Sequence, residues 1–198
     1  MKKIFIALMM ILFATTVTAQ AAEPVRIARL PIIFHCTISD DGTRETLETK
    51  IERATHIPLN GTLQVADFLS PIESGCILEE LWQKMSAADK KAKLADAMRP
   101  LAEKIDADII VCPVMLSYGE TIIGFSGWIG EEILDSRAEV ELIVYDHRTD
   151  TLLDKKASRM YHDAWSNSGT ASYLAAECFD IVIEQTKLRE LIRAVGKN

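Results

Sequence analysis

The sequence predicts an α/β (α+β) fold, in which helices cover the faces of a mixed sheet of about five strands. Two observations lead to this prediction. In the first half, short apolar runs alternate with stretches of helical periodicity, which is typical of parallel strands joined by right-handed crossovers. In the second half, two strand-like stretches flank the turn sequence HRTD, which indicates an antiparallel hairpin. A long helix is expected to end the chain.

The first half is expected to fold as strand, helix, strand, helix, helix and strand. The expected strands cover 25–34, 62–68 and 107–116, and the expected helices cover 40–57, 70–85 and 86–105. The last of these strands is a continuous apolar run, which is typical of a strand covered on both faces. It contains Pro113, which cannot donate a ladder hydrogen bond and therefore predicts a bulge or a strand end.

The helix at 70–85 has clear sequence signals at its start. Ser70 is the expected N-cap, and Pro71 is the expected first helical residue. We expect its apolar residues at helical spacing to face the core. These residues are Ile72, Cys76, Ile77, Leu81 and Met85.

Two further helices carry weaker boundary signals. The helix that follows residue 85 should begin at Ser86, and Pro100 should kink it or split it. The C-terminal helix is expected over 168–195, with Ser168 or Thr170 as its cap. Its apolar residues again recur at helical spacing, so one face should pack on the sheet.

The hairpin of the second half combines a half-buried strand with a more polar one. Residues 137–146 alternate between apolar and charged side chains, so we expect one dry and one wet face. Residues 151–161 form the polar partner strand. Between the two halves, residues 118–136 read as a glycine-containing loop with a large apolar content.

The first 21 residues have the pattern of a signal peptide. Two lysines precede an apolar core, and Ala19 and Ala21 supply the small residues that signal peptidase requires. We therefore expect a signal peptide over 1–21 and a single domain over 22–198. Removing both lysines changes the formal net charge from −7 to −9, which argues against nucleic acid and anionic lipid as partners. No membrane span is expected after cleavage.

Four cysteines, Cys36, Cys76, Cys112 and Cys178, leave two alternatives open. An even number in an exported chain favours disulfides, whereas apolar surroundings favour buried free thiols. One pairing can be excluded if the first and third strands are parallel neighbours with Ile27 level with Asp108. Cys36 then lies ~16 Å along the strands from Cys112, well beyond the ~7 Å that a disulfide spans. We therefore predict that this bridge is absent.

Three segments of the chain resemble one known family. LAEKIDADIIVCPV resembles the family motif L-A-x-x-L-G-A-D-Y-V-V-x-G, AEVELIVYDHRTDTLLDKKA resembles its later hairpin, and RIARLPIIF resembles its first strand. The family is the periplasmic fold family of CsgG, the TolB N-terminal domain and LpoB. The chain departs from it in VCPV, where the motif has a glycine, and at Asp150, where the turn has a glycine. It also lacks a lipid-attachment cysteine and the long membrane hairpins of CsgG. The resemblance implies an envelope binding or assembly module rather than a channel.

The chain carries only weak candidates for catalytic groups. The sequence GFSGW at Gly124–Trp128 lacks the second glycine of a nucleophile elbow. The histidines His35, His56, His147 and His162 lie far apart, and none has a partner at the spacing of a helix-borne metal site. We therefore assign no catalytic, cofactor-binding or metal-binding residue, and we expect no cofactor.

Segment 118–136 contains the candidate partner surface. Its candidate residues are Phe125, Trp128, Ile129 and Ile133. An apolar loop of this kind either folds back onto the core or contacts a partner, and the sequence leaves both alternatives open.

The sequence therefore predicts a periplasmic or secreted, non-enzymatic module of the bacterial cell envelope, which binds another envelope protein or self-associates. The alternative is an exported hydrolase whose site combines distant residues, such as a histidine with Asp163 or Ser126.

The first prediction concerns export. The mature protein should begin at Ala22, within a residue or two, because the signal-peptidase pattern ends at Ala21. Mass spectrometry of the exported protein measures this N-terminus. An intact Met1 in the membrane fraction would contradict the prediction.

Overall fold

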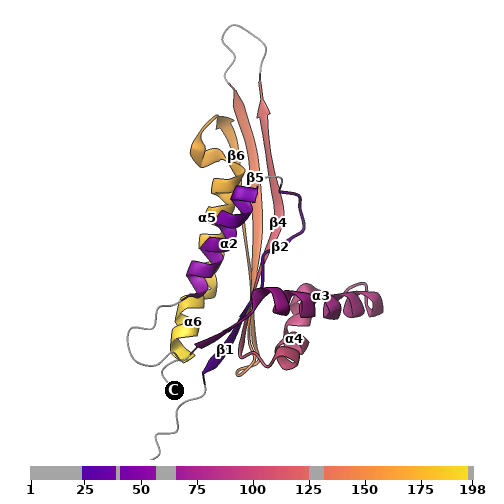
Figure 1. The fold of residues 1–198 in the computed structure, drawn as a ribbon. Helices are drawn as coiled ribbons and strands as arrows, with labels where there is room; N and C mark the ends of the chain where they lie inside the picture. The colour runs from indigo at the N-terminus through magenta and orange to yellow at the C-terminus, as the bar shows by residue number, and fades with distance from the viewer. Residues whose placement is uncertain (1–23, 39–40, 57–65, 125–131, 196–198) are drawn as a thin grey trace, which may run out of the picture.

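The protein folds around a mixed sheet (Figure 1), which has six strands. The computed structural model describes residues 24–38, 41–56, 66–124 and 132–195. The strand order is β3-β1-β4-β5-β6, and β2 also pairs with β4. β1 pairs in parallel with β3 and β4, and β2 pairs in parallel with β4, whereas β5 is antiparallel to both of its neighbours, β4 and β6. The predicted mixed fold is confirmed.

The elements have the following bounds. The strands are β1 (Val25–Arg29), β2 (Ile33–Phe34), β3 (Ala66–Leu69), β4 (Ile109–Ile123), β5 (Ile133–Asp146) and β6 (Thr151–Ala164). The helices are α2 (Asp41–Thr55), α3 (Pro71–Ala88), α4 (Met98–Ile105), α5 (Ala171–Thr186) and α6 (Leu188–Val195), with 3-10 turns η1 (Leu94–Ala97) and η2 (Asn167–Gly169).

Each face of the sheet has its own hydrophobic core. α2, α5 and α6 cover one face, and α3 and α4 lie on the other, where α3 projects away from the sheet (Figure 1). Because side chains alternate along a strand, Val140 and Leu142 pack toward Phe179 of α5, whereas Ile143 packs toward Leu101 of α4. The face of β5 that was expected to contact solvent is therefore solvent-exposed only in the part of the strand that lies beyond the helices.

β4 runs through Pro113 without ending there, so the predicted strand end is wrong. The carbonyl oxygens of Val111 and Met115 accept hydrogen bonds from Leu30 and His35, each at 2.9 Å. Since strand residues alternate in direction, the nitrogen of Pro113 faces this same side. It lies opposite the break between β1 and β2, where no ladder donor is required. The bulge of β4 comes later, between Met115 and Ser117.

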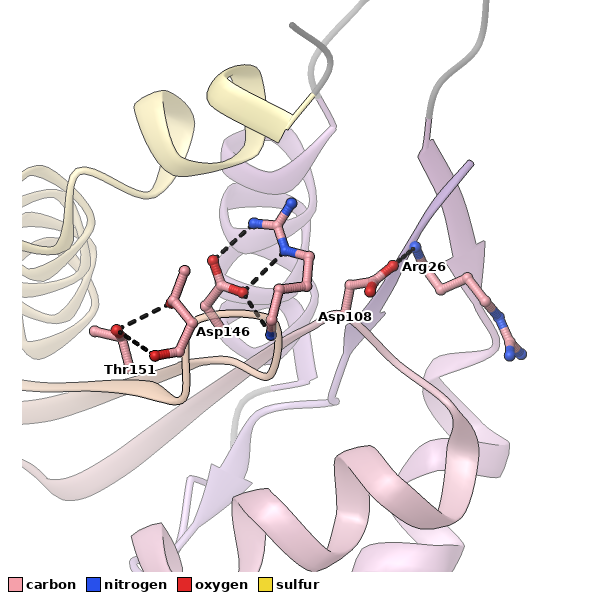
Figure 2. Close-up of polar contacts among 6 residues, drawn as sticks. Arg26, Asp108, Asp146 and Thr151 are labelled. Atoms are coloured by element: carbon pink, nitrogen blue, oxygen red, sulfur yellow. Dashed lines mark hydrogen bonds and ion pairs between the residues drawn. The ribbon is translucent and has the colours of Figure 1, made fainter. Parts of the chain in front are cut away.

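A cluster of polar contacts holds the end of the sheet together (Figure 2). The backbone N–H of Arg26 donates to the Asp108 carboxylate at 2.9 Å, which joins β1 to the start of β4. The buried carboxylate of Asp146 accepts three hydrogen bonds from Arg148, one from its backbone and two from its guanidinium. These bonds fix the turn at 147–150 and support its interpretation as a hairpin turn.

Three predicted boundaries are wrong. Ser86 lies inside α3 and donates its hydroxyl to the carbonyl of Trp82 at 2.7 Å, so it caps nothing. The C-terminal helix is broken at Lys187, which has a φ of 49°. Segment 118–136, expected to be a loop, is strand at 118–123 and at 133–136, because the pairing of β4 with β5 continues outward from Tyr118 and Ala138. The helix expected over 86–105 is interrupted before Pro100 and not at it, because α3 ends at Ala88 and α4 begins at Met98 after η1. Pro100 lies in the first turn of α4, where its missing N–H needs no partner.

All four cysteines are free thiols, and the predicted absence of a Cys36–Cys112 bridge is confirmed. The predicted register was one residue off, because Ile27 pairs with Ile109. Burial raises the pKa of Cys112, and burial raises the pKa of Cys178 to about 11. Burial also raises the pKa of the half-buried Cys36, an effect that nearby Arg44 partly offsets.

The signal-peptide prediction for residues 1–21 falls outside the described residues. Within the described part of the chain, no helix is both long and apolar enough to cross a bilayer.

The second prediction concerns thiol reactivity. Cys76 is exposed and should react first with a thiol reagent, followed by Cys36. Cys112 and Cys178 should react only after unfolding, because they are buried and their raised pKa values leave little reactive thiolate. Mass spectrometry after timed alkylation, with and without denaturant, measures the order. Rapid labelling of Cys112 in the native protein would contradict the packing of the core.

Candidate binding groove

A groove of about 850 Å³ lies between α3 and the sheet. The link between β1 and β2 forms one wall through Leu30 and Pro31, and α3 with η1 forms the other. The sheet forms the floor. The apolar side chains that line it include Ile33, Ile72, Leu78, Trp82, Leu94, Leu116 and Ile143. Binding sites for small ligands have this volume and this predominantly apolar lining.

The packing of α3 creates the groove. Ser74 and Leu78 are the buried residues of α3, and they hold the helix against β1 and α4. Gly75 permits this approach, because a Cβ there would lie 3.2 Å from two carbons of the Pro31 ring. The side of α3 that carries Ile72 and Cys76 is thereby left against open space.

The expected core-facing stripe of α3 is therefore wrong in its N-terminal half. Ile72 is 77% exposed and Cys76 is exposed, whereas Ile77, Leu81 and Met85 are half-buried. At about 100° per residue, Leu81 and Met85 lie on the side of α3 that carries the buried Ser74 and Leu78. Ile72 and Cys76 lie on the opposite side, so the predicted stripe combined residues from two sides of the helix.

The floor of the groove has a charged end on β5 and β6. Glu141 is a buried carboxylate, and its Oε1 lies 3.1 Å from Nζ of Lys156 on the neighbouring strand. Burial raises the pKa of Glu141, and Asp154 raises it further, while Lys156 lowers it. The hydrogen bond to Glu141 raises the pKa of Lys156. Desolvation acts mainly on Glu141, because its side chain is 12% exposed, whereas that of Lys156 is 54% exposed.

The four histidines lie in different places. His35 lines the groove together with Cys76. His56 contacts the ring of Phe68, and His147 contacts Tyr145. Nδ1 of His162 lies 3.7 Å from Asp135 and not beside a nucleophile.

No predicted catalytic combination is assembled in the described part of the chain. Asp163 accepts a hydrogen bond from the backbone of Ala164, and Ser126 lies outside the described residues. Among the residues that the structure describes, no group of three or more histidine, cysteine or acidic side chains is placed to hold a metal ion.

The structure describes one of the four residues of the predicted partner surface. Phe125, Trp128 and Ile129 lie outside the described residues. Ile133 is half-buried, begins β5 and pairs with Ile123 of β4. The structure therefore places the flanks of this segment on an extended hairpin that reaches beyond the helices (Figure 1).

No protein-family model matches the chain, and no curated protein matches its sequence. Solved structures with a similar arrangement include the hypothetical protein CT253 from Chlamydia trachomatis, at 12% identity and a TM-score of 0.47, over 82% of this chain and 95% of that one. Lipoprotein GNA1162 from Neisseria meningitidis has 16% identity and a TM-score of 0.38, over 83% and 99%.

The LpoB C-terminal domain from Salmonella enterica has 9% identity and a TM-score of 0.33, over 74% of this chain and 90% of that one. The LpoB part of the predicted resemblance thus has a counterpart among solved structures, whereas its CsgG and TolB parts stay predictions. All three TM-scores lie below 0.5, so the function of this chain has to be inferred from its own residues.

The third prediction concerns Glu141. Folding raises the pKa of Glu141, so this carboxyl group binds its proton more tightly in the folded protein than in the unfolded one. Its ionisation therefore lowers the free energy of unfolding as the pH rises above ~4.3, the pKa of an unfolded glutamate. Glu141→Gln cannot ionise. The variant should therefore gain stability relative to the wild type as pH increases from about 4. Denaturant unfolding at several pH values measures this difference.

Glu139→Gln is the matched control, since it removes the same charge two residues away on the same strand. Its difference from the wild type should not follow the same rise. A Glu141→Gln variant that loses stability with rising pH would show that the attraction of Lys156 outweighs burial.

Proposed function

We propose that this protein is an exported, non-enzymatic binding module of the bacterial cell envelope, and that the groove binds an apolar segment of another envelope protein. The groove between α3 and the sheet is the observation that carries the proposal. Export rests on the leader at 1–21. The groove takes the role that the sequence had suggested for Phe125, Trp128, Ile129 and Ile133.

The dimensions of the groove favour a peptide segment. Its lining extends from Ile33 on β2 to Lys156 on β6, across β4 and β5. Three strand spacings of about 4.8 Å correspond to roughly 14 Å, enough for several consecutive residues of an extended or helical segment. Ile72 and Trp82 provide apolar contact area, and such contacts at the centre of an interface supply most of its free energy.

The charged end of the groove gives the bound segment an orientation. Lys156 is already paired with Glu141, so the excess charge at this end comes from Asp154. A segment that carries a lysine, an arginine or an unpaired amide N–H next to its apolar residues would donate a hydrogen bond to the Asp154 carboxylate. An acidic segment would be repelled there.

The alternative, an exported hydrolase, is favoured by one observation. His35 and Cys76 line the same groove, and a cysteine with a neighbouring histidine is one pattern of an activated nucleophile. Ester or peptide hydrolysis that disappears in Cys76→Ser would support this alternative over a binding module.

The fourth prediction tests the groove. A photo-crosslinker attached to the exposed Cys76, in a Cys36→Ser background, should label one envelope protein. Ile72→Asp should raise the Kd for this partner roughly 30-fold, the equivalent of about 2 kcal/mol, because it places a charge in the apolar contact. The labelling should weaken accordingly. Ile72 is 77% exposed, so the variant should keep the melting temperature of the wild type.

Ile122→Asp is the control, because Ile122 is also an exposed isoleucine but lies on the hairpin arm. It should label as strongly as the wild type. Equal losses in both variants, or none in Ile72→Asp, would contradict binding in the groove.

A further inference from the structure

β6 forms one edge of the sheet, and among the described residues its backbone pairs with β5 alone. Its pairing with β5 is continuous from Thr151 to Ala164, without proline or bulge. The opposite edge is the four-residue strand β3. Long straight edges of this kind are templates for pairing with another strand.

Two hydrogen bonds show which residues of β6 face outward. Trp165 donates its N–H to the carbonyl of Glu132, and His147 donates to the carbonyl of Asp108. Because backbone direction alternates along a strand, both bonds direct the odd-numbered residues of β6 toward β5. The even-numbered residues direct their N–H and C=O groups to the free edge. They are Leu152, Asp154, Lys156, Ser158, Met160 and His162, and all of them are exposed.

The free edge ends after His162. The N–H of Ala164 donates to the carboxylate of Asp163 at 2.7 Å, and its carbonyl accepts from the Tyr161 hydroxyl at 2.7 Å. Before this point, the one bond that the described residues make to an outward-facing backbone group is a 3.4 Å contact from Arg159 to the carbonyl of Ser158. The backbone from Leu152 to His162 is therefore open to a partner strand.

Side-chain charges exclude several of the central registers in which β6 could pair with a second β6. An antiparallel pair related by a two-fold axis perpendicular to the sheet places residues of equal parity opposite each other. If the two-fold axis passes beside a charged residue, this residue lies opposite its own copy, and two like charges meet. This would happen in registers centred on Asp154, Lys155, Lys156 or Arg159. A centre at Ala157 would oppose Lys155 to Arg159. Like charges directly opposite each other destabilise a sheet.

A centre at Ser158 avoids every one of these oppositions and keeps a long paired stretch. Asp154 then lies opposite His162, and Lys156 lies opposite Met160. These pairs consist of outward-facing residues, so each can exchange two backbone hydrogen bonds. Centres nearer either end of β6 shorten the pairing.

We propose that β6 pairs antiparallel with β6 of a second copy, centred on Ser158, so that the two sheets become one. The outward-facing backbone supplies the hydrogen bonds, and the charge pattern selects the register. This self-association does not depend on the groove proposed above, because its hydrogen bonds come from the backbone of β6, whereas Asp154 and Lys156 line the groove with their side chains.

The test uses cysteine cross-linking in a Cys36→Ser, Cys76→Ser background. Residues of a hydrogen-bonded antiparallel pair lie ~5.5 Å apart at Cα, inside the ~4.4–6.8 Å range of disulfides. Ser158→Cys should therefore form a disulfide-linked dimer with mild oxidant. Lys156→Cys alone should not, because its copies lie four residues, ~13 Å, apart along the strands. A mixture of Lys156→Cys and Met160→Cys should cross-link.

A proline variant tests the same register without cysteine. Ser158→Pro removes an outward N–H and no bond to β5, so the fold should be kept while the dimer is lost. Ser158→Ala is the control and should remain dimeric by sedimentation analysis.

Two results would overturn the proposal. One is equal cross-linking of Ser158→Cys and Lys156→Cys alone. The other is a wild-type protein that sediments as a monomer at the concentration used for cross-linking.

Discussion

The two-sided burial of β4 is the constraint on which the rest of the structure depends. Its backbone bonds to β1 and β2 on one side and to β5 on the other, and its side chains up to Met115 are buried on both faces. Substituting a buried isoleucine such as Ile109 or Ile110 by alanine typically lowers the free energy of unfolding by about 2–5 kcal/mol. The total free energy of unfolding of a domain is only about 5–15 kcal/mol. β4 therefore sets the positions of both layers of helices, and Asp108 fixes where it enters the sheet.

The groove follows from how the chain accommodates Pro113 beside β4. Because Pro113 offers no N–H, the neighbouring strand is broken into β1 and β2, and the link contains Pro31. The N–H of Ile32 in this link donates instead to Glu48 of α2 at 2.7 Å. The link then meets α3 at Gly75, and this contact determines how closely the helix approaches. An irregularity in the central strand thus leads to the opening next to Ile72.

Local signals in the sequence predicted the order of the elements because each is encoded within a few residues. Ser70 and Pro71 fix the start of α3, where Ser70 accepts a hydrogen bond from the N–H of Glu73. The hairpin turn at 147–150 follows from its own polar residues.

The remaining features depend on contacts between distant segments. The strand residues 118–123 have no clear alternation, and they form a strand because β5 pairs with them. Lys187 breaks the last helix with a positive φ, which its sequence neighbours do not predict. The groove was missed because the predicted stripe of α3 combined residues from two sides of the helix. Leu78 is buried, whereas Ile72 in the first turn is 77% exposed.

The groove and the free edge meet on β6 but use different atoms of the same residues. The side chains of Asp154 and Lys156 line the groove, whereas their backbone groups face the edge. Pairing at the edge would leave the ion pair between Lys156 and Glu141 in place, because a strand added beside β6 bonds to its backbone in the plane of the sheet. Two copies joined in this way would carry their grooves on the same face of one sheet, since a two-fold axis perpendicular to a sheet preserves its faces. An apolar partner with two suitable segments could then contact both copies, and its affinity would exceed that of either groove alone.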